Sequence, residues 1–261
     1  MTITFTLLGC GNSAGTPSIG GEWGLCDPSE PRNYRTRASA VVRSDKTSLL
    51  IDTGPDLREQ SIRNGIKDVD AVLYTHAHSD HIAGIDELRV LRVRHKKLFP
   101  IWGMQETITE LKDRFSYLFV ERDSIYPEVL QANVIEPDRM CSEMTIGDIS
   151  FVPFMQDHGT CKTLGFRFGN MAYSTDMRDL DQQALQTLIG IKTWVVDAAA
   201  YKMEVNKVHA GLKEVFALNE IVQAEKVYLT HMPSYMDYRT LLKELPPGYE
   251  PAYDGLSLEI T

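Results

Sequence analysis

Short apolar runs in the first half of the chain alternate with turn-forming segments, a pattern that predicts strands and helices in mixed order. The periodicity of this half predicts strands over 3–8, 38–43, 47–52 and 71–74 and helices over 57–65, 82–93 and 106–119. Ser44-Asp45-Lys46, between the second and third strands, predicts a hairpin. Residues 9–24 are rich in glycine and are expected to form a loop that lines the site.

The second half begins with consecutive strands, and its C-terminal third alternates helices with strands, which is typical of an α/β protein. Its apolar runs predict strands over 132–135, 149–154, 164–168, 171–174, 193–196 and 226–229 and helices over 182–189 and 209–223. Gly169-Asn170 predicts another hairpin. No linker or low-complexity tract interrupts the pattern, so we expect one domain over residues 1–261.

The composition narrows the classes of partner. Hydrophobic residues make up 43% of the 261 residues, and the formal net charge of -9 argues against binding along an extended nucleic acid, which requires a broad basic surface. The four cysteines are scattered without a C-x-x-C pair, which favours a reducing cytoplasm. No window approaches the roughly 20 apolar residues that a membrane span needs. We therefore expect a cytoplasmic protein without a membrane partner.

The segment His76-Ala77-His78-Ser79-Asp80-His81 carries three imidazoles and one carboxylate within six residues. Zinc-type ions bind neutral imidazole nitrogen and carboxylate oxygen, the groups offered here. Because the segment follows a predicted strand and precedes a predicted helix, we expect it to form a strand-to-helix loop. Side chains two residues apart on such a loop can converge on one ion and the next pair on another.

This segment resembles the H-x-H-x-D-H motif of the metallo-β-lactamase superfamily, and the order of later candidate ligands extends the resemblance over nearly the whole chain. The resemblance implies an α/β fold, a four-layer αββα sandwich. It also implies two divalent ions, zinc or manganese, with the ligands His76, His78, His158, Asp176, Asp80, His81 and His231. Asp176 would bridge the ions, and Asp52 in Asp52-Thr53-Gly54 would support the ligand loop. Water held between the ions would ionise near neutral pH and act as the nucleophile.

His209 is a feature shared with the phosphodiesterase branches of the superfamily, in which a histidine at this place faces the substrate phosphate. The resemblance implies that His209 binds substrate and protonates the departing oxygen, and that Asp80 is catalytic as well as a ligand. Similarity to the PhnP-like phosphoribosyl 1,2-cyclic phosphate phosphodiesterases extends to four runs, 9–13, 86–89, 229–231 and 253–256. That branch carries a structural zinc, which we do not expect here because only Cys26 remains in the N-terminal loop and Ser234 stands where a histidine would be needed.

Further candidates for substrate binding lie after the motif. Arg89 begins a local basic run with Arg92, Arg94, His95, Lys96 and Lys97, and we assign Arg89 to the substrate, although a solvated helix face gives the same pattern. Phe115, Tyr117 and Phe119 have the spacing of rings that stack on a base, but core residues share that spacing.

Hydrolysis of a small, cyclic or nucleotide-like phosphodiester is therefore the leading hypothesis. A tRNA 3′ endonuclease shares the ligands but normally carries a glycine-rich basic arm, which we do not find. A lactonase or thioesterase would direct the same nucleophile at a carbonyl group. A metal-containing nucleotide-binding module would bind phosphate without turnover. The sequence leaves open whether the chain forms a homodimer.

Overall fold

The computed structural model describes residues 3–121 and 127–261, and its strands form two β-sheets of seven strands each. In spatial order, the first sheet contains β14 (Ser257–Ile260), β1 (Ile3–Gly9), β2 (Ser39–Arg43), β3 (Ser48–Ile51), β4 (Ala71–Leu73), β5 (Phe99–Gly103) and β6 (Leu130–Val134). The second contains β13 (Tyr249–Pro251), β12 (Lys226–Thr230), β11 (Thr193–Asp197), β10 (Met171–Ser174), β9 (Cys161–Phe168), β8 (Ile149–His158) and β7 (Met144–Ile146).

Both faces of the first sheet are buried, because successive side chains along its strands point into different core clusters. On β2, Ala40 and Val42 belong to the core shared with the second sheet, whereas Val41 between them belongs to a separate core cluster on the opposite face. The two sheets meet through contacts such as Phe5 on β1 with Tyr173 on β10, whose ring centroids are 5.5 Å apart. A sheet covered on both faces explains why its strands read as continuous apolar runs.

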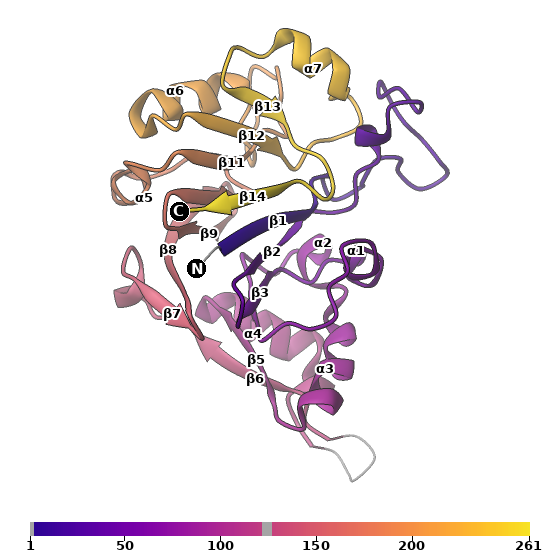
Figure 1. Cartoon of the computed structure of the whole chain (residues 1–261), viewed down its shortest axis with the longest axis vertical. Helices are drawn as coiled ribbons and strands as arrows, with labels where there is room; N and C mark the ends of the chain where they lie inside the picture. Colours follow the sequence, from indigo (N-terminus) through magenta and orange to yellow (C-terminus); the bar gives the residue numbers. More distant parts are fainter. Residues whose placement is uncertain (1–2, 122–126) are drawn as a thin grey trace.

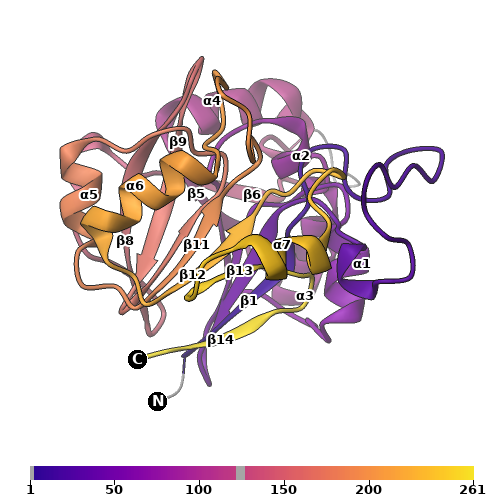
Figure 2. The ribbon, with the colours of Figure 1, turned by 90° about the horizontal axis from the view of Figure 1, so that it is seen from above.

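Helices cover the outer faces of both sheets. The first four are α1 (Leu57–Arg63), α2 (Ser79–Ile82), α3 (Leu88–His95) and α4 (Gln105–Arg114), and the last three are α5 (Gln182–Leu188), α6 (Leu212–Val222) and α7 (Tyr238–Glu244). Figures 1 and 2 show α1 to α4 beside the first sheet and α5 to α7 beside the second. This arrangement is the four-layer αββα sandwich, and it confirms the fold class inferred from the sequence.

The direction of the strands determines where side chains can meet. β3, β4, β5 and β6 run parallel to one another, and so do β10, β11, β12 and β13. The carboxyl ends of parallel neighbours lie at the same edge of a sheet, so the segments that follow them are brought together. The predicted ligands after β4, β10 and β12 leave the sheets at such ends.

Three predicted helices were wrong in their bounds. The one predicted over 106–119 is shorter, because α4 ends at Arg114 and a 3-10 turn over Ser116–Leu118 follows. The helix predicted over 82–93 is divided into α2, a 3-10 turn over Ile85–Glu87, and α3, so that Asp80 and His81 lie on a short helix rather than on a loop. Gly84 causes the division, because its N–H donates to Thr53 O at 2.8 Å and a Cβ there would meet Gly54 O at 2.2 Å. This close approach requires glycine and interrupts the helix.

The helix predicted over 209–223 begins later, at Leu212, so His209 lies in the loop before α6. Gly211 is the extended N-cap residue, and its N–H donates to Glu214 Oε2 at 3.0 Å. Both predicted hairpins are confirmed by antiparallel pairing of β2 with β3 and of β9 with β10. The sequence patterns missed β5, β7, β13, β14 and α7. None of the helices within residues 3–121 and 127–261 is both long and apolar enough to cross a bilayer.

Candidate metal centre

The structure brings all seven predicted ligands to one end of the sandwich, where segments from both sheets meet. His76 and His78 follow β4, Asp80 and His81 lie on α2, His158 ends β8, and Asp176 and His231 follow β10 and β12. Their ligand atoms form two close groups: His76, His78, His158 and Asp176 in the first, and Asp80, His81 and His231 in the second. Residues far apart in the sequence therefore supply two neighbouring sets of donors.

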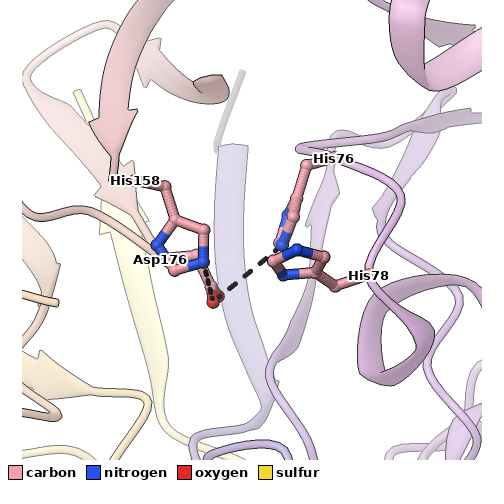
Figure 3. A group of neighbouring side chains, drawn as sticks. All are labelled: His76, His78, His158 and Asp176. Atoms are coloured by element: carbon pink, nitrogen blue, oxygen red, sulfur yellow. Dashed lines mark ion pairs between the residues drawn. The ribbon is translucent and has the colours of Figure 1, made fainter. Parts of the chain in front are cut away.

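The carboxylate of Asp176 lies between the two groups. Its Oδ1 is 3.5 Å from His158 Nε2 and 4.0 Å from His76 Nε2. Its Oδ2 is 2.9 Å from His81 Nε2 and 3.2 Å from His231 Nδ1. Figure 3 shows His76 and His158 approaching Asp176 from opposite sides. Because each oxygen faces a different set of imidazoles, Asp176 has the geometry of a bridging ligand.

Three residues of the centre have a left-handed backbone. Asp52, Asp176 and His231 have φ angles of 62°, 48° and 56°, values that are uncommon outside glycine. Such conformations cost on the order of 1–3 kcal/mol each and persist where the surrounding structure enforces them. Asp52 and His231 come directly after β3 and β12, and Asp176 comes two residues after β10, so all three lie in turns at strand ends.

Asp52 orients one imidazole of each group. Its Oδ2 lies 2.7 Å from His81 Nδ1, and its two oxygens accept hydrogen bonds from the N–H and Oγ1 of Thr75, each at 2.8 Å. Thr75 Oγ1 in turn lies 3.0 Å from His76 Nδ1. Since the Thr75 hydroxyl donates to Asp52, it accepts from His76 Nδ1, and in the neutral form of either ring Nε2 is the unprotonated nitrogen that can bind a metal ion.

The environment of these rings fits a divalent cation. His76 Nε2 is buried and makes no hydrogen bond, and a buried polar atom without a partner requires an explanation. Burial and the neighbouring His81 lower the pKa of His76 well below its ordinary value, which keeps the ring in the neutral, ligating form. Imidazole and carboxylate donors in this number suit zinc-type ions.

His81 has the opposite pKa shift. Burial alone would lower the pKa, but the Asp176 and Asp52 carboxylates on either side raise it well above the ordinary value. In the metal-free protein a proton on His81 therefore supplies positive charge between two carboxylates. A metal ion replaces that charge, so metal binding is expected to release a proton.

His209 lies beside both groups without being required by either. It forms a close group with Asp176 and His231, and its ring centroid is 4.9 Å from that of His158. Its Nδ1 lies 2.6 Å from Oδ2 of the fully buried Asp197. Burial lowers the pKa of His209, but the charge and hydrogen bond of Asp197 outweigh this effect and raise it to about 9. This pair favours imidazolium at neutral pH, whereas bound cations would oppose it.

The loop that carries His209 also orients a ligand, which sequence reasoning missed. His158 Nδ1 donates to Val208 O at 2.7 Å, and Asn206 Oδ1 accepts from the N–H groups of Val208 and His209, each at 2.9 Å. Gly159 has φ 73°, and a Cβ there would meet Lys207 O at 2.2 Å, so the loop lies directly against the turn after His158. The sequence pointed to this loop only through Asp197, a carboxylate at the end of a buried strand.

The structure does not bring the other substrate candidates into the metal groups. Arg89 Nε pairs with Asp86 Oδ1 at 2.9 Å, and the Arg89 guanidinium lies 5.3 Å from the Tyr117 ring centroid. Phe115, Tyr117 and Phe119 pack against the core on the outer face of the first sheet. Substrate contact by these residues remains a prediction from the sequence.

The N-terminal loop is held in place by the buried side chain of Arg35. Arg35 donates to Cys26 Sγ at 3.8 Å, to Pro233 O at 3.3 Å and to Met236 O at 2.6 Å. The N–H groups of Leu25 and Cys26 donate to Ser234 O. Hydrogen bonds to Arg35 and to the backbone of Ser234 thus join this loop to the segment after β12.

The chain is similar to proteins of known families. A family model described as a beta-lactamase superfamily domain matches residues 47–232. The chain is 31% identical over 257 residues to a Porphyromonas gingivalis protein named octanoyltransferase, a match that covers 96% of this chain and 50% of that protein. It is 29% identical over 135 residues to ribonuclease Z of Methanopyrus kandleri, covering 49% of this chain and 43% of that protein. The chain thus spans about half the length of these curated relatives.

A solved structure matches over the full length. The crystal structure of a diphosphatase of the PhnP family superimposes with a TM-score of 0.89 and 32% sequence identity. The match covers 100% of this chain and 98% of that one.

Substitution of Asp52 tests the orientation of the ligands. In Asp52→Asn one side-chain oxygen becomes an amide donor, so either His81 or Thr75 loses its acceptor. We expect metal affinity to fall about 10- to 100-fold while the fold is retained. Competition with a chromophoric chelator measures the affinity and circular dichroism the fold. Asp45→Asn, in an exposed turn, is the matched control, and a folded Asp52→Asn variant with wild-type affinity would contradict this role.

Proposed function

This chain belongs to the metallo-β-lactamase superfamily, in its PhnP-like branch of metal-dependent hydrolases, and on that premise we propose that it cleaves a small phosphodiester. The observation that carries the proposal is the placement of His209. A histidine held by a buried carboxylate lies beside two groups of metal ligands and is not needed to complete either group.

We assign His209 the role of general acid. Its Nδ1 is engaged by Asp197, which leaves Nε2 to hold the proton that a departing alkoxide oxygen takes up. Asp197 is fixed in turn because it accepts hydrogen bonds from the N–H groups of Met177 and Ala199, at 2.9 and 2.7 Å. When bound by the seven ligands, divalent ions supply activation of water and neutralisation of phosphate charge. We propose two such ions, zinc or manganese.

The names of the relatives support a phosphorus centre. Ribonuclease and diphosphatase activities both break phosphorus–oxygen bonds, and both names occur among the similar proteins. The net charge of -9 disfavours a long polyanionic substrate, so we propose a small substrate rather than an extended RNA. We further propose that the protein acts in the cytoplasm; its oligomeric state is open, with a homodimer as one candidate.

A second candidate is hydrolysis of a carboxylic ester or thioester. One observation favours it: the relative that matches nearly the whole chain is named octanoyltransferase, although this chain spans only half of that protein. The metal centre suits a carbonyl group equally well. Fast hydrolysis of a lactone or thioester by the metal-loaded protein, without phosphodiester turnover, would establish this alternative, and nucleotide binding without any turnover would indicate a binding module.

Removal of His209 tests the acid role through the leaving group. For a phosphodiester with an alkoxide leaving group, we expect His209→Ala to lower kcat about 10²- to 10⁴-fold, because an alkoxide departs poorly without a proton. For a 4-nitrophenyl ester the loss should be much smaller, since 4-nitrophenolate is stable without protonation. Steady-state kinetics of the metal-loaded protein with both substrates measures the difference.

His95→Ala is the control for this comparison, because His95 pairs with Asp68 away from the metal groups. It should leave both rates unchanged. An equal loss for both leaving groups in His209→Ala would show that His209 acts on metal or substrate binding instead.

A double-mutant cycle tests whether Asp197 acts through His209. We expect Asp197→Asn to lower kcat for the alkoxide substrate by about tenfold or more, and the double variant to be no slower than His209→Ala alone. Metal content is measured in parallel, because the N–H of Met177, next to Asp176, donates to Asp197. Additive losses in the double variant would exclude a joint role.

A further inference from the structure

A cavity of about 490 Å³ opens beside the first group of metal ligands. His76 and His78 form one side of it, and segments of both sheets form the rest: the start of α4, the residues after β6, and β8 with β9. This volume is within the range of small-molecule sites, which typically measure roughly 300–1,000 Å³. A substrate whose phosphate lies at the metal ligands can therefore extend one substituent into the cavity.

Apolar side chains, three of them methionines, line much of this cavity. Met104, Met140 and Met155 line it together with Ile135, and no aromatic ring lines it among the residues that the structure describes, apart from the two ligand imidazoles. Methionine side chains are unbranched and adapt to the shape of an apolar guest, whereas recognition of a nucleobase commonly uses an aromatic stacking surface. The lining suits a flexible alkyl chain better than a flat heterocycle.

The rim adds a charge preference. Glu106 and Glu110 on α4 and Lys162 on β9 line the cavity, and all three side chains are exposed. Two carboxylates against one ammonium group disfavour a second anionic group on the substituent. The substituent that enters should therefore be uncharged.

We propose that this cavity binds an uncharged, unbranched alkyl chain that forms one ester arm of the phosphodiester substrate. The inference rests on the proposed function for its catalytic readout, but binding to the cavity can be measured without turnover. It specifies the substrate class: a phosphodiester with one aliphatic arm.

A series of alkyl 4-nitrophenyl phosphates, from ethyl to octyl, tests the cavity. Water adds to phosphorus, the bond to 4-nitrophenolate breaks, and the alkyl phosphate remains, so only the alkyl arm varies. With the metal-loaded protein we expect kcat/KM to rise about two- to fourfold for each methylene that enters the cavity, through a falling KM. A kcat/KM that is independent of chain length would overturn the proposal.

Met155→Gln places a polar group of similar size in the wall. We expect it to lower kcat/KM for the octyl ester far more than for the ethyl ester, so that most of the gain from ethyl to octyl is lost. Leu242→Gln, at an exposed apolar position on α7 outside the cavity, is the matched control and should retain the full gain. Equal losses for the ethyl and octyl esters in Met155→Gln would count against the cavity as the site of the chain.

Two further measurements separate failure of the cavity from failure of the chemistry. Octylphosphonate should bind the metal-loaded wild type more tightly than ethylphosphonate in calorimetry, and Met155→Gln should abolish the difference. If no phosphodiester is hydrolysed but this difference is found, the cavity assignment stands and the proposed function fails. If thymidine 5′-(4-nitrophenyl phosphate) is preferred over the octyl ester, and the preference depends on Met155, the occupant is a nucleoside and the alkyl assignment is wrong.

Discussion

The carboxylate of Asp176 faces two sets of imidazoles at once, and this geometry depends on the position of one sheet relative to the other. One oxygen lies near His158 and His76, and the other near His81 and His231. These partners come from segments after β4, on α2, at the end of β8 and after β12. A shift of one sheet against the other would separate the two groups, so the apolar core between the sheets also maintains the spacing of the metal ligands.

Two further buried carboxylates, Asp52 and Asp197, orient the imidazole rings of the centre. Asp52 holds His81 directly and His76 through Thr75, which leaves the ligating nitrogens free. Asp197 holds His209 in the same manner but beside the cluster rather than within it. Burial of a carboxylate is costly unless hydrogen bonds and opposite charge compensate, and both groups are compensated by backbone N–H donors and an imidazole. The two proposed roles, metal ligation and proton donation, thus rest on the same arrangement of a buried carboxylate and an imidazole.

Local sequence patterns predicted the α/β class and the histidine cluster. Apolar strands and alternating helices indicated an α/β protein, and His76 to His81 indicated metal ligands by density alone, whereas the four-layer sandwich came from the resemblance to a family. His158, Asp176 and His231 are single residues in strand-ending turns, so only the resemblance to a family identified them. Local periodicity could not place the break between α2 and α3 or the start of α6, because Gly84 and Gly211 act through tertiary contacts with Gly54 and Tyr201. The cavity was not predictable either, since its walls come from residues between 76 and 162 that meet only in the folded chain.

A crystal structure of the metal-loaded protein, with anomalous difference maps at the absorption edge of the added metal, tests directly whether Asp176 bridges two metal ions. We expect two peaks on either side of the Asp176 carboxylate, about 3.5–4 Å apart, one within reach of His76, His78 and His158 and the other of Asp80, His81 and His231. A single peak at full metal loading, or peaks that do not contact Asp176, would contradict the bridging role.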